Sequence, residues 1–274
     1  MKLSQTLKHN LKAVYARTYV RVVSTFREPE WVLSESLIPL LVVFAAATLY
    51  RVSGSEELAG FAVVGGAMMA FWDNVLWLMA SQFYWEKESG NLDLYIIAPV
   101  SKMSILLGMS VGSIINTSVR AVLIVLVATL ALNIKINVVD PAAVFLVFVL
   151  TMTALYGLGM LMSSLYMLYG RGAFNLNDIL TEPVYLLSGL YFPTVGRFSP
   201  FPWVVQLIAS LIPLTFGIDG LRRTIILGQT VQEVLLHVGV LSVLTFVLIP
   251  LAWRVLLFME NLGRKEGRLS LRWI

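Results

Sequence analysis

Apolar residues gather in six long runs that are separated by shorter polar stretches. The runs cover residues 31–50, 58–83, 105–132, 142–168, 174–195 and 235–258. About twenty consecutive apolar residues let an α-helix cross the hydrocarbon core of a bilayer. The pattern therefore predicts an all-α integral membrane protein with six transmembrane helices. The fifth run also contains Asp178 and Glu182, so we expect its first half to face protein or water rather than lipid.

A further apolar stretch, residues 201–216, is too short to cross a bilayer. Pro200, Pro202 and Pro213 bracket it, which favours a re-entrant or interfacial hairpin. We place this hairpin in an extracellular region, 194–232, before the last span. The alternative is a seventh span, which would put the two termini on opposite sides of the membrane.

The segment before the first span, residues 1–30, has the pattern of an amphipathic helix. Apolar side chains recur there at intervals of three and four residues, from Leu3, Leu7 and Leu11 to Val14 and Val22. We expect this helix to lie in the cytoplasmic interface, with its basic residues near anionic lipid head groups. The alternative is a solvated basic arm.

Composition supports a membrane protein and excludes several chemistries. Of the 274 residues, 58% are hydrophobic and 13% charged, whereas soluble domains carry about 25% charged residues. There is no cysteine, and the two histidines, His9 and His237, fall on opposite sides of the expected membrane. We therefore expect no metal site and no catalytic triad. No Gly-Lys pair occurs, so the chain lacks a phosphate-binding loop, and we expect a single transmembrane domain, 1–274, that is not an enzyme.

The distribution of basic residues predicts the orientation. With the amino terminus inside and six spans, 14 of the 20 Lys and Arg residues fall on the cytoplasmic side, 5 fall outside and Arg120 lies within a span. This is a clear positive-inside bias. It predicts that both termini are cytoplasmic, and it opposes the seven-span alternative because that would export the basic tail.

Two segments resemble one known family. Residues 86–93 read E-K-E-S-G-N-L-D, followed by I-A-P-V-S at 97–101. Residues 183–193 read P-V-Y-L-L-S-G-L-Y-F-P, followed by P-W at 202–203, P-L-T at 213–215 and D-G-L-R at 219–222. Both resemble motifs of the ABC type-two exporter permeases, in the same order and at the corresponding spans. Asn91 and Tyr95 depart from the Thr and Leu that are usual in this family.

The resemblance implies that the loop at 84–103 docks on a separate ATPase subunit. Gly90 permits a tight turn. Asn91 supplies a polar cap at the start of a short helix, and Pro99 ends that helix. The residues expected to couple to the ATPase are Glu86, Glu88, Gly90, Leu92, Asp93 and Pro99. The alternative is an ordinary connecting loop with solvated carboxylates.

The resemblance also implies the assembly and its activity. It implies a homodimer that binds two ABC ATPase subunits, with ATP and Mg²⁺ held by those subunits and no cofactor in this chain. The expected substrate is hydrophobic or amphipathic (a drug, a lipid or a lipid-linked glycan) and is moved outward across the cytoplasmic membrane. Membrane lipid, rather than nucleic acid, is the other expected partner. The candidate residues of an extracellular gate are Phe192, Pro193, Trp203 and Pro213.

Ionisable residues inside the spans are candidates for a polar pathway. On insertion scales, a charge at the bilayer centre costs about 2.5–3.5 kcal/mol of free energy. We therefore expect a functional role or an ion-pair partner for each ionisable residue in the spans, which are Asp73, Arg120, Asp178 and Glu182. Asp73 and Arg120 lie near the middle of the second and third spans, which predicts a structural pair, with substrate contact as the alternative. The same two residues support a different function, an ion-coupled secondary carrier.

The orientation can be tested with single cysteines, because the chain has none. We expect a cysteine at Ser270 to react with an impermeant thiol reagent only from the inside, and one at Ser199 only from the outside. Labelling of Ser270→Cys from outside intact cells would contradict the six-span topology.

Overall fold

The computed structural model describes residues 2–195 and 199–266, without the side chains of residues 2–5, 92, 93 and 96. Leu92 and Asp93 are therefore placed only by their backbone, and Ser270 lies outside the described residues. The described chain is helical, with no strand. Its helices are α1 (Lys2–Arg27), α2 (Pro29–Val52), α3 (Glu56–Asp73), α4 (Gln82–Glu88), α5 (Leu92–Ile97), α6 (Lys102–Leu132), α7 (Pro141–Tyr169), α8 (Phe174–Leu187), α9 (Trp203–Ser210), α10 (Pro213–Ile225) and α11 (Leu235–Lys265), with a π-helical segment η1 (Asn74–Met79) and a 3-10 turn η2 (Gly170–Ala173).

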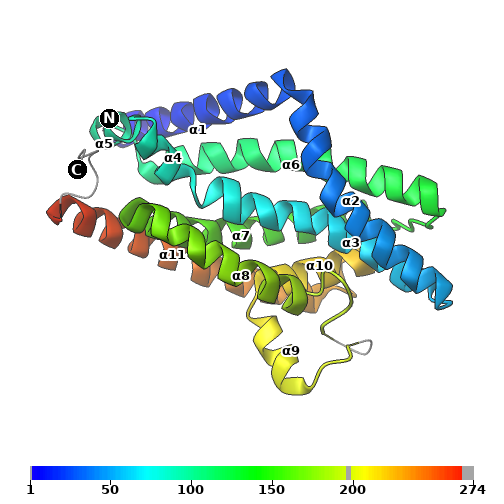
Figure 1. Cartoon of the computed structure of the whole chain (residues 1–274). Helices are drawn as coiled ribbons and strands as arrows, with labels where there is room; N and C mark the ends of the chain where they lie inside the picture. Colours follow the sequence, from blue (N-terminus) through cyan, green and yellow to red (C-terminus); the bar gives the residue numbers. More distant parts are fainter. Residues whose placement is uncertain (1, 196–198, 267–274) are drawn as a thin grey trace.

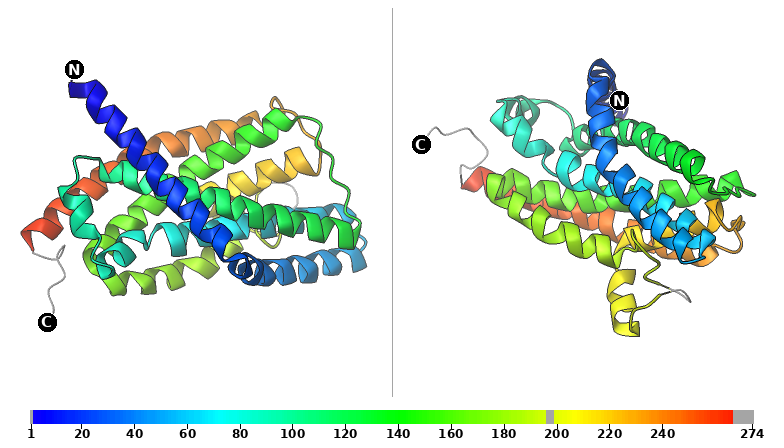
Figure 2. Two further views of the ribbon diagram at one scale, coloured as in Figure 1. Left: turned by 90° about the horizontal axis from the view of Figure 1, so that it is seen from above. Right: turned by 45° about the vertical axis from the view of Figure 1, so that its right-hand side comes forward.

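The predicted all-α membrane architecture is confirmed. By length and composition, 5 helical stretches can cross a membrane, or up to 6 with the bent pair α9 and α10. One of the 5 stretches, Pro141–Leu187, has 47 residues and would be about 70 Å long as a single helix. The chain instead turns at Gly170, where φ is +55°, so that α7 and α8 form a helical hairpin (Figures 1 and 2). The fifth predicted span, 174–195, is helical only over the 14 residues of α8, about 21 Å, which is too short to cross the hydrocarbon core alone.

Helices α1 and α2 together follow the length of α6. Asn10 meets Ser101, and Thr18 donates a hydrogen bond to the carbonyl of Gly108 (2.9 Å), so α1 runs parallel to α6. The chain then bends at Glu28, where Pro29 begins α2, and α2 continues along the second half of α6 (Figure 1). The predicted helix in 1–30 is thus present, and its position at a membrane interface stays a prediction.

Small residues on α6 allow this close packing. A Cβ at Gly108 would lie 2.5 Å from the carbonyl oxygen of Val14, and one at Gly112 would lie 2.7 Å from the Cβ of Arg21. Helices in membranes pack closely where small residues let two backbones approach. The sequence of α6 therefore fixes where α1 lies.

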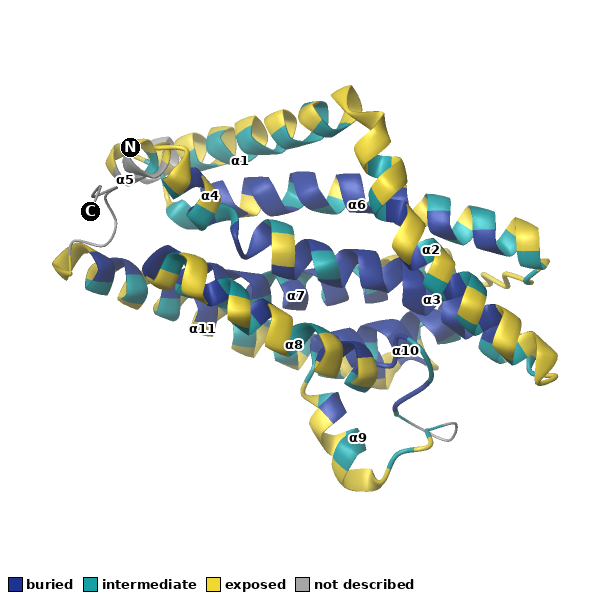
Figure 3. Ribbon diagram, in the orientation of Figure 1, coloured by how far each residue is buried: buried dark blue, intermediate teal, exposed yellow. Residues whose placement is uncertain are grey.

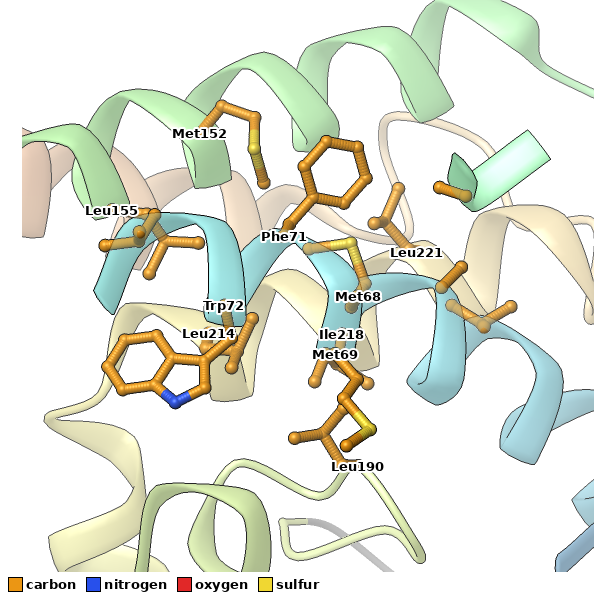
Figure 4. Close-up of a cluster of buried hydrophobic side chains, with 14 of the residues drawn as sticks. Met68, Met69, Phe71, Trp72, Met152, Leu155, Leu190, Leu214, Ile218 and Leu221 are labelled. Carbon is orange, nitrogen blue, oxygen red and sulfur yellow. The ribbon is translucent and has the colours of Figure 1, made fainter. Parts of the chain in front are cut away.

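Helix α3 forms the centre of the bundle. It is apolar on every side and buried from Ala59 to Trp72, as expected for a helix with no polar face, and Figure 3 shows it covered by its neighbours. Phe71, Met68 and Leu221 pack together in the main hydrophobic cluster, with Leu155 and Leu214 nearby (Figure 4). This core holds α6, α7 and α10 around α3.

The chain between α8 and α11 leaves and returns at the same end of the bundle. Tyr191 accepts a hydrogen bond from the hydroxyl of Tyr50 (3.0 Å) near the end of α2, and Ile225 accepts one from the backbone of Asn137 (2.9 Å) in the loop after α6. Between them, α9 and α10 are bent by 98°. The opposite end holds the start of α6, where Lys102 pairs with Glu260 of α11 (2.7 Å).

The packing of α3 on the turn after α8 generates a stability prediction. A Cβ at Gly65 would lie 2.1 Å from the carbonyl oxygen of Leu190, which is backbone and cannot move alone, whereas Gly239 on the surface of α11 has nothing within 4 Å. We expect Gly65→Ala to destabilise the protein by about 1–3 kcal/mol, and Gly239→Ala to be neutral or slightly stabilising. Thermal unfolding in detergent measures both variants, and equal melting temperatures would show that this contact is absent.

Candidate coupling site and intramembrane polar groups

The loop between α4 and α5 turns at Gly90, as the sequence predicts. Gly90 has φ of +73°, a left-handed conformation that costs a residue with a side chain free energy. Asn91 stands at the N-cap of α5, but its side chain forms no capping hydrogen bond, so the predicted polar cap is wrong. The Asn91 amide instead donates to a carboxylate oxygen of Glu86 at 3.1 Å.

Glu86 is the centre of a buried polar cluster at this end of the bundle. The residue is only 7% exposed. Its carboxylate forms an ion pair with Arg17 of α1 and accepts hydrogen bonds from Tyr95 (2.9 Å) and Gln82 (3.2 Å) as well as from Asn91. The Arg17 guanidinium also lies 5.2 Å from the centre of the Tyr95 ring, a cation–π distance.

The cluster joins the loop to α1. Burial, together with the neighbouring Glu86 carboxylate, raises the pKa of Tyr95 to about 12, so this hydroxyl keeps its proton and remains a donor at neutral pH. Removing one partner would leave a buried charge without compensation, which is strongly destabilising. The α4–α5 loop and α1 are therefore expected to move together.

The cluster places Glu86 inside the protein. We expect both Glu86 and Glu88 to couple to the ATPase, and of the two only Glu88 is exposed. The exposed apolar side chains beside it, which the sequence did not single out, are Trp85, Leu94 and Ile97. Gly90 and Pro99 are also exposed, so the accessible surface of the loop is more apolar than expected.

A second set of contacts attaches the far end of the loop to the bundle. The backbone N–H of Ser101 donates to the side-chain oxygen of Asn10 at 2.9 Å. Lys102 pairs with Glu260 of α11, which also pairs with Arg264 (2.6 Å). The loop is thus anchored to α1 at two points and to α11 at one.

The predicted pair of Asp73 and Arg120 is wrong. Asp73 accepts a hydrogen bond from the hydroxyl of Tyr185 on α8, whereas Arg120 forms an ion pair with Glu35 on α2. The other terminal nitrogen of Arg120, Nη2, donates a hydrogen bond to Oγ1 of Thr117 (3.0 Å). Asp73 is the last residue of α3 and directly precedes the π-helical segment η1, and such breaks are frequent at functional sites.

The two other intramembrane acids lie on the exposed side of α8. Asp178 and Glu182 are exposed, and no ion pair includes either of them in the part of the chain that the structure describes. The opposite side of α8 is fixed by Asn177, which is buried and donates to the carbonyl of Leu76 in η1 (2.7 Å). The expectation that the first half of this span faces protein or water rather than lipid stays a prediction.

The candidate gate residues divide into a buried and an exposed group. Phe192 packs against Phe201, with ring centres 5.5 Å apart, and Pro193 and Pro213 are buried. Trp203 is 74% exposed. Trp203 is therefore on the surface at the start of α9, two residues after the Phe201 that packs against Phe192.

The sequence did not indicate the burial of Arg222, which is one of the five basic residues counted outside the membrane. Arg222 is only 1% exposed. It donates to the carbonyls of Phe61 on α3 (3.0 Å) and Leu190 after α8 (3.2 Å). The neighbouring Asp219 pairs instead with Arg223 and His237, both at 2.7 Å, and His237 is itself buried. The D-G-L-R motif marked this region, but no local pattern shows which of two adjacent arginines is buried.

Comparison with known proteins decides the family. The model of the ABC-2 type transporter family matches residues 9–226, which includes the α4–α5 loop, the buried Arg222 and five of the six spans predicted from the sequence. The chain belongs to the ABC-2 type transporter family. Members of this family are membrane permease components of ABC transporters, and a separate subunit carries the ATPase.

Among curated proteins, this ABC-2 permease is similar to nodulation protein J of Rhizobium leguminosarum bv. viciae. The two are 33% identical over 118 residues. The matched segment covers 43% of this chain and 42% of that protein, so it spans less than half of the relative's length. The similarity supports the family assignment.

The pair formed by Glu35 and Arg120 generates a double-mutant prediction. We expect Glu35→Gln to destabilise the ABC-2 permease by about 3–5 kcal/mol, because it leaves the buried Arg120 charged and unpaired. Arg120→Gln should cost less, because the Glu35 side chain that it leaves unpaired is 35% exposed. The double variant should lose less than the sum of the two. Thermal unfolding in detergent measures the three variants, with Asp73→Asn plus Arg120→Gln as the control pair. Additive losses for Glu35 and Arg120 would contradict the ion pair.

Proposed function

We propose that this ABC-2 permease exports a hydrophobic or amphipathic substrate, such as a drug, a lipid or a lipid-linked glycan, and is driven by ATP hydrolysis on two separate ATPase subunits. ATP and Mg²⁺ would be held by those subunits. The observation that carries the proposal is the α4–α5 loop, which presents Glu88 and the apolar side chains of Trp85, Leu94 and Ile97 at the surface. Exposed apolar groups with a charge at their edge are typical of protein-binding surfaces.

The anchoring of the loop supports a mechanical role. Its Glu86 is bonded to Arg17 of α1, and the residue after its last turn, Lys102, is bonded to Glu260 of α11. A movement of the docked ATPase would therefore displace α1 and the inner ends of α6 and α11 together. Rigid coupling of this kind lets closure of the ATPase subunits change the shape of the bundle.

The exposed side of α8 supports a substrate pathway between two copies of the chain. Asp178 and Glu182 on this side would be costly against lipid. A second copy or a water-filled path would satisfy them, and we propose a homodimer with the path along α8. Tyr185 lies on the buried side of α8, where it is bonded to Asp73 next to η1. A change in the path along α8 would therefore be transmitted to η1. An amphipathic substrate suits a path that has both carboxylates and large apolar side chains.

The outer end supports the direction of transport. The α9–α10 segment starts and returns at the end opposite the coupling loop, bent by 98°, which is compatible with a re-entrant hairpin over the exit. If the 14 basic residues that the sequence assigns to the inner side lie in the cytoplasm, both termini would be cytoplasmic and the gate extracellular. The chain would then be a multi-pass protein of the cytoplasmic membrane.

The alternative of an ion-coupled carrier loses its basis. It required Asp73 and Arg120 to act as a relay, but the two residues have different partners, Tyr185 and Glu35. Membership of the ABC-2 family supplies an ATPase as the source of energy instead.

The coupling proposal predicts the effect of two changes in the loop. Gly90→Val forces a β-branched residue into a left-handed conformation at a cost of about 1–3 kcal/mol, and it adds no clash because nothing lies within 4 Å. Glu88→Lys reverses an exposed charge and should weaken ATPase binding about three- to tenfold. High salt should partly restore binding, because it screens the repulsion between exposed charges. Both variants should insert normally while transport and its associated ATPase activity fall.

Vesicles that contain the permease and its co-purified ATPase provide the measurement. Glu57→Lys, which reverses an exposed charge at the opposite end of the bundle, is the matched control and should behave as wild type. Unchanged substrate-dependent ATPase activity in the combined Gly90→Val and Glu88→Lys variant would mean that the loop is only a connection.

A further inference from the structure

A polar cavity lies where α1 bends into α2. Its volume is about 290 Å³, at the small end of the range for ligand pockets and suited to a head group rather than to a whole drug-sized molecule. Four elements contribute to it, and the residues used below are Arg21 and Thr25 of α1, Glu28 at the bend, Trp31 and Glu35 of α2, and Ser113, Asn116 and Arg120 of α6.

The cavity contains a cation that lacks an ion-pair partner. Arg21 uses its Nε to donate to Ser113 at 3.2 Å, and no ion pair of Arg21 occurs among the described residues. The carboxylate of Glu35 is already paired with Arg120. The terminal nitrogens of Arg21 are thus the groups in the cavity that remain suited to a planar, bidentate contact with phosphate.

The cavity also contains a buried acceptor without a donor. Asn116 is only 6% exposed, and its amide nitrogen donates to Thr25 (2.6 Å) and to the carbonyl of Arg21 (3.1 Å). Its carbonyl oxygen, Oδ1, has no hydrogen-bond partner. A buried polar atom of this kind costs about 1–3 kcal/mol until it is satisfied, and a ligand hydroxyl or N–H would satisfy it.

The position of the cavity selects a ligand that reaches it from the membrane. Ser113 lies 11 residues after the start of α6, roughly 16 Å along the helix, so the cavity is at the depth of an inner leaflet rather than in free solvent. Trp31 on its rim is 57% exposed, and tryptophan is enriched where head groups meet acyl chains. Glu28, also exposed on the rim, disfavours a ligand with excess negative charge and tolerates one with hydroxyl or amino groups.

We propose that the cavity at the bend between α1 and α2 binds the head group of a lipid-anchored molecule that carries a phosphate and an adjacent hydroxyl or amino group. Arg21 binds the phosphate, and Oδ1 of Asn116 accepts a hydrogen bond from the hydroxyl or amino group. Trp31 packs against the first carbons of the lipid chain. This binding is independent of whether the bound molecule is a resident membrane lipid or the transported substrate.

Photo-crosslinking tests the proposal with a defined probe. The whole chain is placed in nanodiscs of phosphatidylcholine that contain a phosphatidylglycerol with a photoreactive group near its head group, and crosslinked peptides are identified by mass spectrometry. We expect crosslinks to be concentrated in residues 21–35 and 113–120. Replacing part of the phosphatidylcholine of the disc by unlabelled phosphatidylglycerol should lower the crosslink yield at least about tenfold, because the head group of phosphatidylcholine has no hydroxyl or N–H donor. Crosslinks spread evenly over the lipid-facing helices, or a yield that unlabelled phosphatidylglycerol leaves unchanged, would overturn the proposal.

A matched pair of variants isolates the phosphate contact. Arg21→Gln should lower the crosslink yield about tenfold, whereas Arg27→Gln, which removes the same charge from the exposed end of the same helix, should leave it unchanged. Equal yields for the two variants would overturn the role of Arg21. The competition in the wild-type protein remains decisive if Arg21→Gln does not fold.

The same crosslink distinguishes the two sources of the ligand. In vesicles with the ATPase and MgATP, a transported molecule is released from the cavity and its crosslink yield falls during turnover. A resident lipid gives a constant yield. Both results support the site, and a probe that never reaches residues 21–35 in either state contradicts it.

Discussion

A carboxylate that is buried in protein is stable only where hydrogen-bond donors or a cation compensate its charge. At the end of the bundle that carries the α4–α5 loop, this carboxylate is that of Glu86. The ion pair with Arg17 and the hydrogen bonds from Gln82, Asn91 and Tyr95 meet it. Those partners come from α1, α4 and the α5 segment, so satisfying one charge brings three segments together. Because α1 also packs closely on Gly108 and Gly112 of α6, the α4–α5 loop, α1 and the first half of α6 form a single unit.

The same constraint recurs along the bundle at greater depth. Arg120 is met by Glu35, Asp73 by Tyr185, and Arg222 by the carbonyl oxygens of Phe61 and Leu190. These groups need protein partners because no water is available to solvate them in a membrane. Each of the contacts joins segments that are distant in sequence. Arg21 and Asn116 at the bend are incompletely satisfied by comparison, which is why the cavity they line is suited to a ligand.

The helices could be predicted from sequence because their signal is local. Runs of apolar residues gave the spans, the 3-4 spacing gave α1, and Gly90 alone indicated a turn with positive φ, which the structure has. The pairings could not be predicted in the same way. Hydropathy places Asp73 and Arg120 at similar depth but carries no information on which side of its helix each residue lies, and the actual partners are Tyr185 and Glu35. The burial of Glu86 likewise depends on Arg17, 69 positions away, which no local motif reveals.

The attachment of the α4–α5 loop to α1 is tested most directly by the distance between two spin labels. In this cysteine-free chain, labels at Lys12→Cys on α1 and Ser89→Cys beside the turn report the relative motion of the two segments in nanodiscs. The account predicts a narrow distance distribution that broadens clearly when Glu86→Gln is added and stays narrow when the exposed Glu88→Gln is added instead. Equal widths for the two variants would show that Glu86 does not hold the loop to α1 and would contradict the account.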